Sequence, residues 1–225
     1  MKDQILRYAA IIVAAGRGTR AGGQVPKQWQ DVAGRPVAAW TLERFAGATT
    51  RILVVNESDM EHARQFATTP DIRVVTGGAS RAASVRAGLD ALVDNAPERV
   101  LIHDVARPCI TSTVIDNVLT ALDNFAGAAP ALPVTDALWS GRDGQVAGIT
   151  PRDGLFRAQT PQGFHYPAIL AAHASASPDA ADDVAVALAA GLPVAIVEGS
   201  EDNLKITGPA DFARAAAILE RQNGH

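Results

Sequence analysis

Cysteine is almost missing from this sequence of 225 residues, which contains a single one, Cys109. One thiol cannot form an internal disulfide, so the fold does not depend on an oxidising compartment. We expect Cys109 to be a small buried core residue rather than a nucleophile. The shortage of cysteine therefore predicts a cytoplasmic protein.

The sequence also lacks an excess of positive charge and a long apolar run. Its 20 Lys and Arg residues are outnumbered by 24 Asp and Glu residues, which gives a net charge of -4. Nucleic acids and anionic membrane surfaces bind clusters of basic residues, so we expect neither as a partner. The apolar run before Gly16 is about eight residues long, too short to cross a bilayer. No membrane segment is predicted.

What the sequence does have is the composition of a packed α/β protein. Hydrophobic residues make up 48% of the chain, and its length suits a single domain over residues 1–225. Short apolar runs alternate with amphipathic segments, which predicts a Rossmann-like, mostly parallel sheet with helices on both faces. The predicted strands are Ala9 to Ala14, Ile52 to Val55, Ile72 to Val75, Val100 to His103, Gly127 to Leu132 and Val194 to Val197. The predicted helices are Pro36 to Phe45, Asp59 to Thr68, Arg81 to Val93, Ser112 to Asn124, Ala180 to Ala190 and Pro209 to Gln222.

Two stretches interrupt this alternation. Residues 15–35 contain five glycines and Pro26 and are long enough to be a functional loop. Residues 137–162 carry several glycines, short strand-like pieces and little helical periodicity. The second stretch is typical of a hairpin, and we expect it to project from the sheet as a β-arm.

The loop AAGRGTRAGGQVPK, from Ala14 to Lys27, follows the first strand. Its glycines let the backbone approach a ligand and present N–H groups to phosphate oxygens, while Arg17, Arg20 and Lys27 add positive charge. A dinucleotide fingerprint is the competing interpretation, but Pro26 disrupts the helix it needs and the acidic residue expected about 20 residues later is missing. The P-loop pattern fails because the loop has no G-K-[ST]. The pattern therefore favours a polyphosphate ligand.

Further motifs narrow the interpretation. The PKQW end of the loop is joined by HDVARP (His103 to Pro108), TPQ (Thr160 to Gln162) and DNLKIT (Asp202 to Thr207). With these motifs in this order, the chain resembles the 2-C-methyl-D-erythritol 4-phosphate cytidylyltransferases over nearly its full length. The resemblance implies a nucleotidyltransferase fold, CTP and a sugar-alcohol phosphate as substrates, and a step of non-mevalonate isoprenoid biosynthesis.

The resemblance also implies roles for individual residues. Arg20 and Lys27 would contact the triphosphate and stabilise the charge that grows on the transferring oxygens, with Lys205 near the α-phosphate. Asp104 would bind Mg²⁺, which prefers few protein oxygens besides phosphates and waters, and with Arg107 it would contact the acceptor. The residues implied to bind the nucleotide are Ala14, Ala15, Gly16, Gly18, Gly78 and Ser84.

In such enzymes the arm crosses to a neighbouring subunit. Residues matching Arg152 and Thr160 would then meet the acceptor's phosphate in the partner's site, which makes a homodimer with composite active sites. For His103 we expect packing in the core. Arg81 is expected to order the start of its helix or the loop before it, with ligand contact as the other possibility.

The sequence departs from the family pattern at three alanines. Ala79 stands where an acidic residue is common, and Ala137 and Ala181 stand where threonines are usual. A lost hydrogen bond to a phosphate costs about 1.5 to 3 kcal/mol unless something replaces it. Two alternatives therefore stay open: a ribitol-5-phosphate cytidylyltransferase, and a nucleotide-binding module without turnover.

Overall fold

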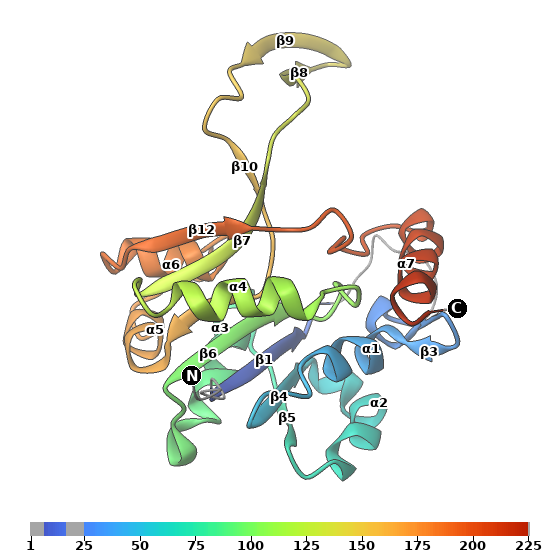
Figure 1. The fold of residues 1–225 in the computed structure, drawn as a ribbon, viewed down its shortest axis with the longest axis vertical. Coiled ribbons are helices and arrows are strands. Elements are labelled where there is room, and N and C mark those ends of the chain that lie inside the picture. The colour runs from blue at the N-terminus through green and yellow to red at the C-terminus, as the bar shows by residue number, and fades with distance from the viewer. Residues whose placement is uncertain (1–6, 17–24, 225) are drawn as a thin grey trace.

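The computed structural model describes residues 7–16 and 25–224. An eight-stranded sheet runs in the order β10-β7-β11-β6-β1-β4-β5, with β12 paired to β7 (Figure 1). Its strands are β1 (Tyr8–Ala14), β4 (Thr50–Val55), β5 (Ile72–Thr76), β6 (Arg99–Asp104), β7 (Gly127–Pro133), β10 (Phe156–Ala158), β11 (Gln162–His165) and β12 (Val194–Glu198). The β6-β1-β4-β5 part and the β7–β12 pair are parallel, whereas β10 and β11 run antiparallel. This confirms the predicted α/β class with a mostly parallel sheet.

Helices cover both faces of the sheet. They are α1 (Val37–Arg44), α2 (Met60–Arg64), α3 (Arg81–Asp90), α4 (Ser112–Ala121), α5 (Tyr166–His173), α6 (Asp183–Ala189) and α7 (Pro209–Gln222). Side chains of β1 alternate between two core clusters: Ala10 and Ile12 pack with α1 and α4, and Ala9 and Ile11 with α3, α5 and α6. This alternation explains why β1 is apolar at every position, because both faces of the strand are buried.

A third cluster joins the two ends of the chain. The short strands β2 (Asp31–Val32) and β3 (Arg35–Pro36) form a hairpin inside the stretch predicted as a loop. The apolar side of α7 packs against Val32, Trp40 and Cys109. Cys109 is fully buried, and burial raises the pKa of its thiol to about 12. This confirms the expected core role, and the packing brings the C-terminal helix beside the β2–β3 hairpin and α1.

The structure differs from the predicted elements in several boundaries. The helix predicted from Ala180 begins at Asp183, because Asp182 is its N-cap and accepts a hydrogen bond from the Ala185 N–H at 2.9 Å. Strand β11 and helix α5 were not predicted. In β11 a Cβ on Gly163 would lie 2.5 Å from the Val118 side chain, so the glycine lets α4 pack closely on the strand.

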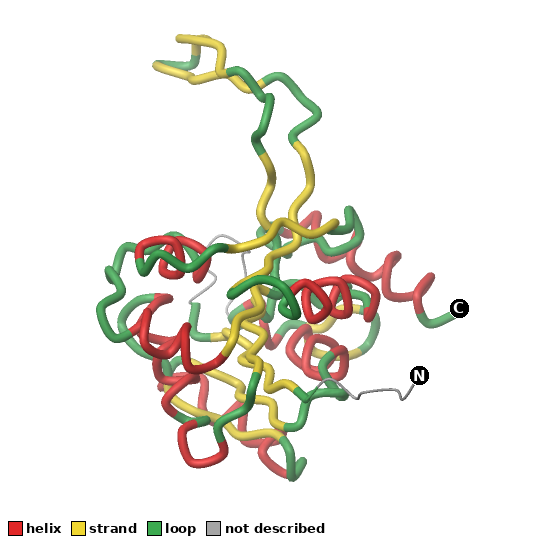
Figure 2. Tube along the Cα trace, turned by 60° about the vertical axis from the view of Figure 1, so that its left-hand side comes forward, coloured by secondary structure: helices red, strands yellow, loops and turns green. Residues whose placement is uncertain are grey.

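The arm is shorter than predicted. Its hairpin, β8 (Leu138–Arg142) and β9 (Gln145–Thr150), stands away from the body, as Figures 1 and 2 show. Strand β10 returns to the main sheet and pairs with β7, so Gln159 and Thr160 are buried in the body. The prediction that the arm extends to residue 162 was therefore wrong. Within the described residues, no helix is long and apolar enough to cross a membrane.

Candidate active site

A cavity of about 610 Å³ opens where β1, β4, β5 and β6 end. Parallel strands place their carboxyl ends at one edge of a sheet, and ligands of open α/β folds bind there. The residues that line the cavity come from loops far apart in the sequence. They are Val13, Ala14, Ala15, Gly16, Lys27, Gln28, Asn56, Gly78, Ala79, Ser80, Arg81, Ser84, Asp104, Val105, Ala106 and Lys205.

Most of the residues predicted to bind the nucleotide meet in this cavity. Ala14, Ala15 and Gly16 line it from the end of β1, and Gly78 and Ser84 from the start of α3. A Cβ on Gly16 would meet no described atom within 4 Å. The predictions for Gly18 and Arg20, and the charge expected of Arg17, lie outside the described residues.

Ser84 shapes the loop before α3. Its side chain is buried; the hydroxyl donates to the Ser80 carbonyl at 2.9 Å and accepts from the Gly78 N–H at 3.2 Å. A Cβ on Gly78 would lie 2.5 Å from the Ala83 Cβ, so the loop tolerates only glycine without a shift. These contacts hold the backbone of the loop at the cavity edge.

Two lysines enter the cavity from opposite ends of the chain. Lys27 Nζ donates to the Ile206 carbonyl at 2.7 Å, and Lys205 Nζ donates to Asp104 Oδ2 at 2.7 Å. The side chain of Lys205 is 43% exposed, whereas that of Asp104 is 14% exposed. Two of the predicted cations thus reach the same site, where Lys205 pairs with Asp104 at the end of β6.

Asp104 is held in its ionised form. Burial by itself raises the pKa of a carboxyl group, but Lys205, Arg81 and Arg107 outweigh burial and lower the pKa of Asp104 to about 2. Among the described residues no group of three or more His, Cys, Asp or Glu side chains could hold a metal ion. A single ionised carboxylate beside a phosphate site nevertheless fits Mg²⁺, which takes most of its ligands from phosphates and water.

Replacing Asp104 with asparagine should remove a pH-dependent part of the stability of the metal-free protein. Because the folded-state pKa is depressed, the carboxylate contributes stability above about pH 4 and loses it as the pH falls toward 2. We expect the free energy of unfolding to drop by about 2 kcal/mol at pH 7 in Asp104→Asn. Urea unfolding at pH 7, 5 and 3, with the exposed Asp94→Asn as a charge-matched control, checks this. A loss that is equally large at pH 3 would contradict it.

Several predicted acceptor residues are engaged inside the body. Thr160 is buried; its hydroxyl accepts from the Asp104 N–H at 3.1 Å and lies 3.0 Å from His103 Nδ1. It therefore supports the active site of its own chain, and the prediction that it reaches a partner's site on the arm was wrong. Arg107 donates to the Asn203 carbonyl at 2.6 Å and is 11% exposed. His103 is fully buried, as predicted, and burial lowers its pKa to about 4.

Arg152 lies elsewhere. It follows β9 on the arm, is exposed, and donates to the Thr135 carbonyl. The described lining of the cavity does not include Arg152, so its predicted contact with the acceptor remains a prediction about a second subunit. Ala137 and Ala181 are likewise exposed and outside this lining.

Sequence reasoning missed Gln28. Its side chain is buried, and its amide nitrogen lies 3.1 Å from the Ala14 carbonyl, 3.3 Å from the Gly16 carbonyl and 2.9 Å from Asp59 Oδ2. Gln28 therefore ties the two ends of the nucleotide loop to each other and to the segment after β4. The PKQ motif contained this residue, but its partners are set by the fold.

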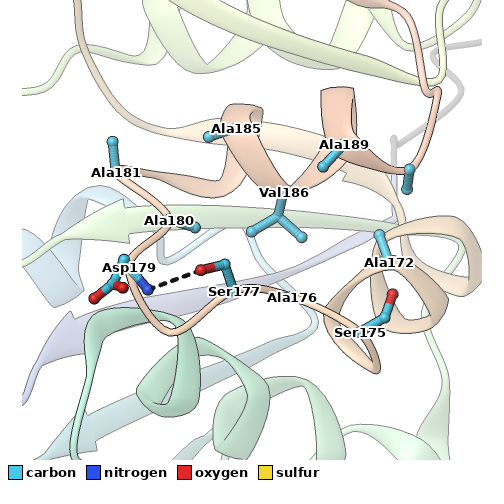
Figure 3. Close-up of a pocket in the computed structure, with 11 residues that line it drawn as sticks. Ala172, Ser175, Ala176, Ser177, Asp179, Ala180, Ala181, Ala185, Val186 and Ala189 are labelled. Atoms are coloured by element: carbon cyan, nitrogen blue, oxygen red, sulfur yellow. Dashed lines mark hydrogen bonds between the residues drawn. The ribbon is translucent and has the colours of Figure 1, made fainter.

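A second cavity of about 370 Å³ lies between α5 and α6 (Figure 3). Its lining is mostly alanine, with Ser175, Ser177 and Asp179 as polar members, and it includes Ala181. The part of the chain that is described places no Lys or Arg in this lining, so it offers no charge to a phosphate. The first cavity is therefore the candidate active site.

Comparisons with known proteins show what the whole chain is similar to. The family model described as 2-C-methyl-D-erythritol 4-phosphate cytidylyltransferase matches residues 8–221. A protein of that name from Cereibacter sphaeroides is 58% identical over 216 residues, 94% of this chain and 96% of its own length. A bifunctional enzyme IspD/IspF from Ruegeria pomeroyi is 60% identical over 215 residues, 95% of this chain; the match spans 57% of that longer protein.

Solved structures show the same fold. The crystal structure of 2-C-methyl-D-erythritol 4-phosphate cytidylyltransferase from Thermus thermophilus superposes with a TM-score of 0.79 at 32% identity, covering 93% of this chain and 98% of that one. A 4-diphosphocytidyl-2C-methyl-D-erythritol synthase from Anaerococcus prevotii superposes with a TM-score of 0.81 at 28% identity, covering 98% and 100%. The similarity therefore extends over the arm and the body alike.

Proposed function

Because the chain belongs to the 2-C-methyl-D-erythritol 4-phosphate cytidylyltransferase family, we propose that it transfers CMP from CTP to 2-C-methyl-D-erythritol 4-phosphate. This membership confirms the resemblance that the sequence motifs carry. The products are 4-diphosphocytidyl-2-C-methyl-D-erythritol and pyrophosphate. This reaction is a step of isoprenoid biosynthesis. We also propose a cytoplasmic location, because a chain with a single cysteine forms no internal disulfide and does not depend on an oxidising compartment.

The reaction needs no covalent intermediate with the protein. A phosphate oxygen of the acceptor attacks the α-phosphorus of CTP, and the bond from that phosphorus to the oxygen bridging the α- and β-phosphates breaks. Negative charge grows on the transferring oxygens, so catalysis depends on positioning and on fixed positive charge. The observation that carries the proposal is the convergence of Lys27 and Lys205 on the cavity at the end of β1.

Mg²⁺ belongs to the proposal as well. Asp104 would hold the ion, because it is an ionised carboxylate at the carboxyl end of β6. Its Oδ2 is paired with Lys205, whose side chain is exposed and can move. When bound, Mg²⁺ would neutralise charge on the triphosphate oxygens. Lys205 would exchange Asp104 for a phosphate oxygen when the substrates enter.

We further propose that the protein acts as a homodimer through its arm. Exposed apolar side chains gather there, with Trp139 65% exposed, Val146 58% and Ile149 79%. Such side chains on a projecting hairpin favour a covering partner. A two-fold dimer would bring Arg152 of each arm to the active site of the other subunit.

The test is an assay of pyrophosphate release with CTP and Mg²⁺. We expect turnover with 2-C-methyl-D-erythritol 4-phosphate that is at least about tenfold more efficient than with ribitol 5-phosphate, since a misfitted hydrogen-bonding acceptor costs at least about 1.4 kcal/mol. Faster reaction of ribitol 5-phosphate would assign the acceptor differently. CTP binding without pyrophosphate, even at high enzyme concentration, would instead indicate a module without turnover.

A further inference from the structure

A row of ionisable side chains runs from the packed helices into the active site. His173 Nε2 at the end of α5 lies 3.2 Å from Asp183 Oδ1 at the start of α6. Asp183 Oδ2 lies 2.8 Å from Arg81 Nη2 on α3, and the same Nη2 lies 3.7 Å from Asp104 Oδ1. Arg81 therefore stands between two carboxylates and is closer to the one outside the active site.

Asp183 needs Arg81 as its counter-ion. Its side chain is 0% exposed, and a buried carboxylate is costly unless a positive charge accompanies it. Asp104 depends less on Arg81, because Lys205 already pairs with its other oxygen at 2.7 Å. Burial lowers the pKa of Arg81, but Asp183 and then Asp104 outweigh it and raise the pKa overall, so the guanidinium stays charged.

The two cations near Asp104 differ in mobility. Lys205 is 43% exposed and carries its charge on a flexible stem, so it can move to an incoming phosphate. Arg81 is 26% exposed and sits in the first turn of α3. If Arg81 closed on Asp104, its planar guanidinium could form a two-pronged pair with the carboxylate and compete with a metal ion for the same oxygens.

We propose that Asp183 is a positioning residue that holds Arg81 back from Asp104 and so keeps the Asp104 carboxylate available to Mg²⁺ and the nucleotide. This inference rests on the proposed function, because it assigns Asp104 to the metal. Asp183 touches no substrate in this scheme. It acts through Arg81, by the ion pair that joins the first residue of α3 to the first residue of α6.

The Asp183 carboxylate can be replaced without loss of the contacts that begin α6. The backbone N–H groups of Asp183 and Val184 donate to Gln162 Oε1 at 2.9 and 3.1 Å. Asp182, not Asp183, caps the helix. Asp183→Asn therefore keeps the backbone contacts and the size of the side chain while removing the charge that holds Arg81.

The measurement is the affinity for α,β-methylene CTP, a non-hydrolysable analogue, by calorimetry in Mg²⁺ and in EDTA. The ratio of the two dissociation constants gives the gain in affinity due to Mg²⁺. We expect this gain to fall about tenfold in Asp183→Asn, within the usual range for coupled neighbours. The affinity in EDTA should change less than about threefold, since the nucleotide's own contacts remain.

Two further variants separate positioning from general damage. In Asp183→Asn/Arg81→Gln the competing guanidinium is gone, so the gain should return to that of Arg81→Gln alone. Asp182→Asn, which removes a neighbouring charge but keeps a capping side chain, should leave the gain within about twofold. A helix weakened for structural reasons would not be rescued by a second substitution at Arg81.

The outcomes are decisive in both directions. The positioning role is overturned if Asp183→Asn shows the same gain in affinity due to Mg²⁺ as the wild-type protein. It is also overturned if this gain is as small in Asp183→Asn/Arg81→Gln as in Asp183→Asn. Turnover of the wild-type protein is measured separately. If the wild-type protein transfers CMP but Asp183→Asn keeps the full gain in affinity due to Mg²⁺, the positioning role fails and the proposed function stands. A wild-type protein that gains no affinity from Mg²⁺ overturns both the metal site and this inference.

Discussion

Replacing Lys27 with methionine is expected to lower kcat by about 100-fold or more while leaving KM for CTP within about tenfold. Lys27 reaches the cavity beside the loop that carries Lys205, where its ammonium group can meet charge that develops in the transition state. Loss of one preorganised donor at such a place costs about 2.7 to 4 kcal/mol of transition-state stabilisation. Steady-state kinetics of pyrophosphate release at saturating acceptor measures the effect.

The control for this variant is Arg86→Met, which removes a positive charge from the same protein at an ion pair with Asp90 on α3. It should leave kcat within about twofold, because an exposed i,i+4 pair contributes little. Thermal unfolding of Lys27→Met checks the fold, since loss of the bond to the Ile206 carbonyl costs about 1 kcal/mol. An unchanged kcat with a raised KM would assign Lys27 to uniform binding and refute a role specific to the transition state.

Co-expressing two inactive variants in equal amounts should restore activity to about one quarter of wild type. If Arg152 serves the partner's site, Lys27→Met and Arg152→Ala damage opposite halves of each composite site. A mixed dimer then has one site with both defects and one with none. Random association of equal amounts of the two chains makes about half of the dimers mixed. Since one of the two sites in each mixed dimer is intact, about a quarter of all sites are intact. The measurement is turnover after the two variants are co-expressed and purified without selecting for either homodimer.

The arm supplies its own matched control. Arg142, on the β8–β9 hairpin of the same arm, lies outside the proposed acceptor contact, so Arg142→Ala should retain activity by itself. If the co-expressed pair is no more active than the two single variants added together, Arg152 lies in its own subunit's site or outside any site. Monomeric protein in sedimentation experiments would refute the composite site directly.

The core of the fold was predictable because it depends on local patterns. Apolar runs such as Ile52 to Val55 are buried on both faces, and the predicted parallel strands β1, β4, β5 and β6 are all present. Strand β11 escaped prediction because it is short and contains Gly163. The end of the arm was misplaced because Phe156–Ala158 is only three residues long and exposed, although its backbone pairs with β7.

The candidate site was predictable only in its parts. Lys27, Asp104 and Lys205 stand out by motif, and each lines the cavity. The sequence places Thr160 on the arm, because position along the chain cannot tell a residue at the foot of a hairpin from one on it. Gln28 and Asp183 do not stand out, since their importance lies in partners distant along the chain.

By itself the sequence determined the class of fold, the glycine-rich loop after β1 and the family of the chain, since periodicity and motif order are local properties that need no coordinates. The tertiary structure decided what these residues do together. The order of the strands brings Lys27 to the Ile206 carbonyl, 179 positions away, and Lys205 to Asp104. Helices α3 and α6 both pack against α5, and Arg81 of α3 lies between Asp183 at the start of α6 and Asp104 at the end of β6. Such pairings arise from sheet order and helix packing, which no local pattern encodes.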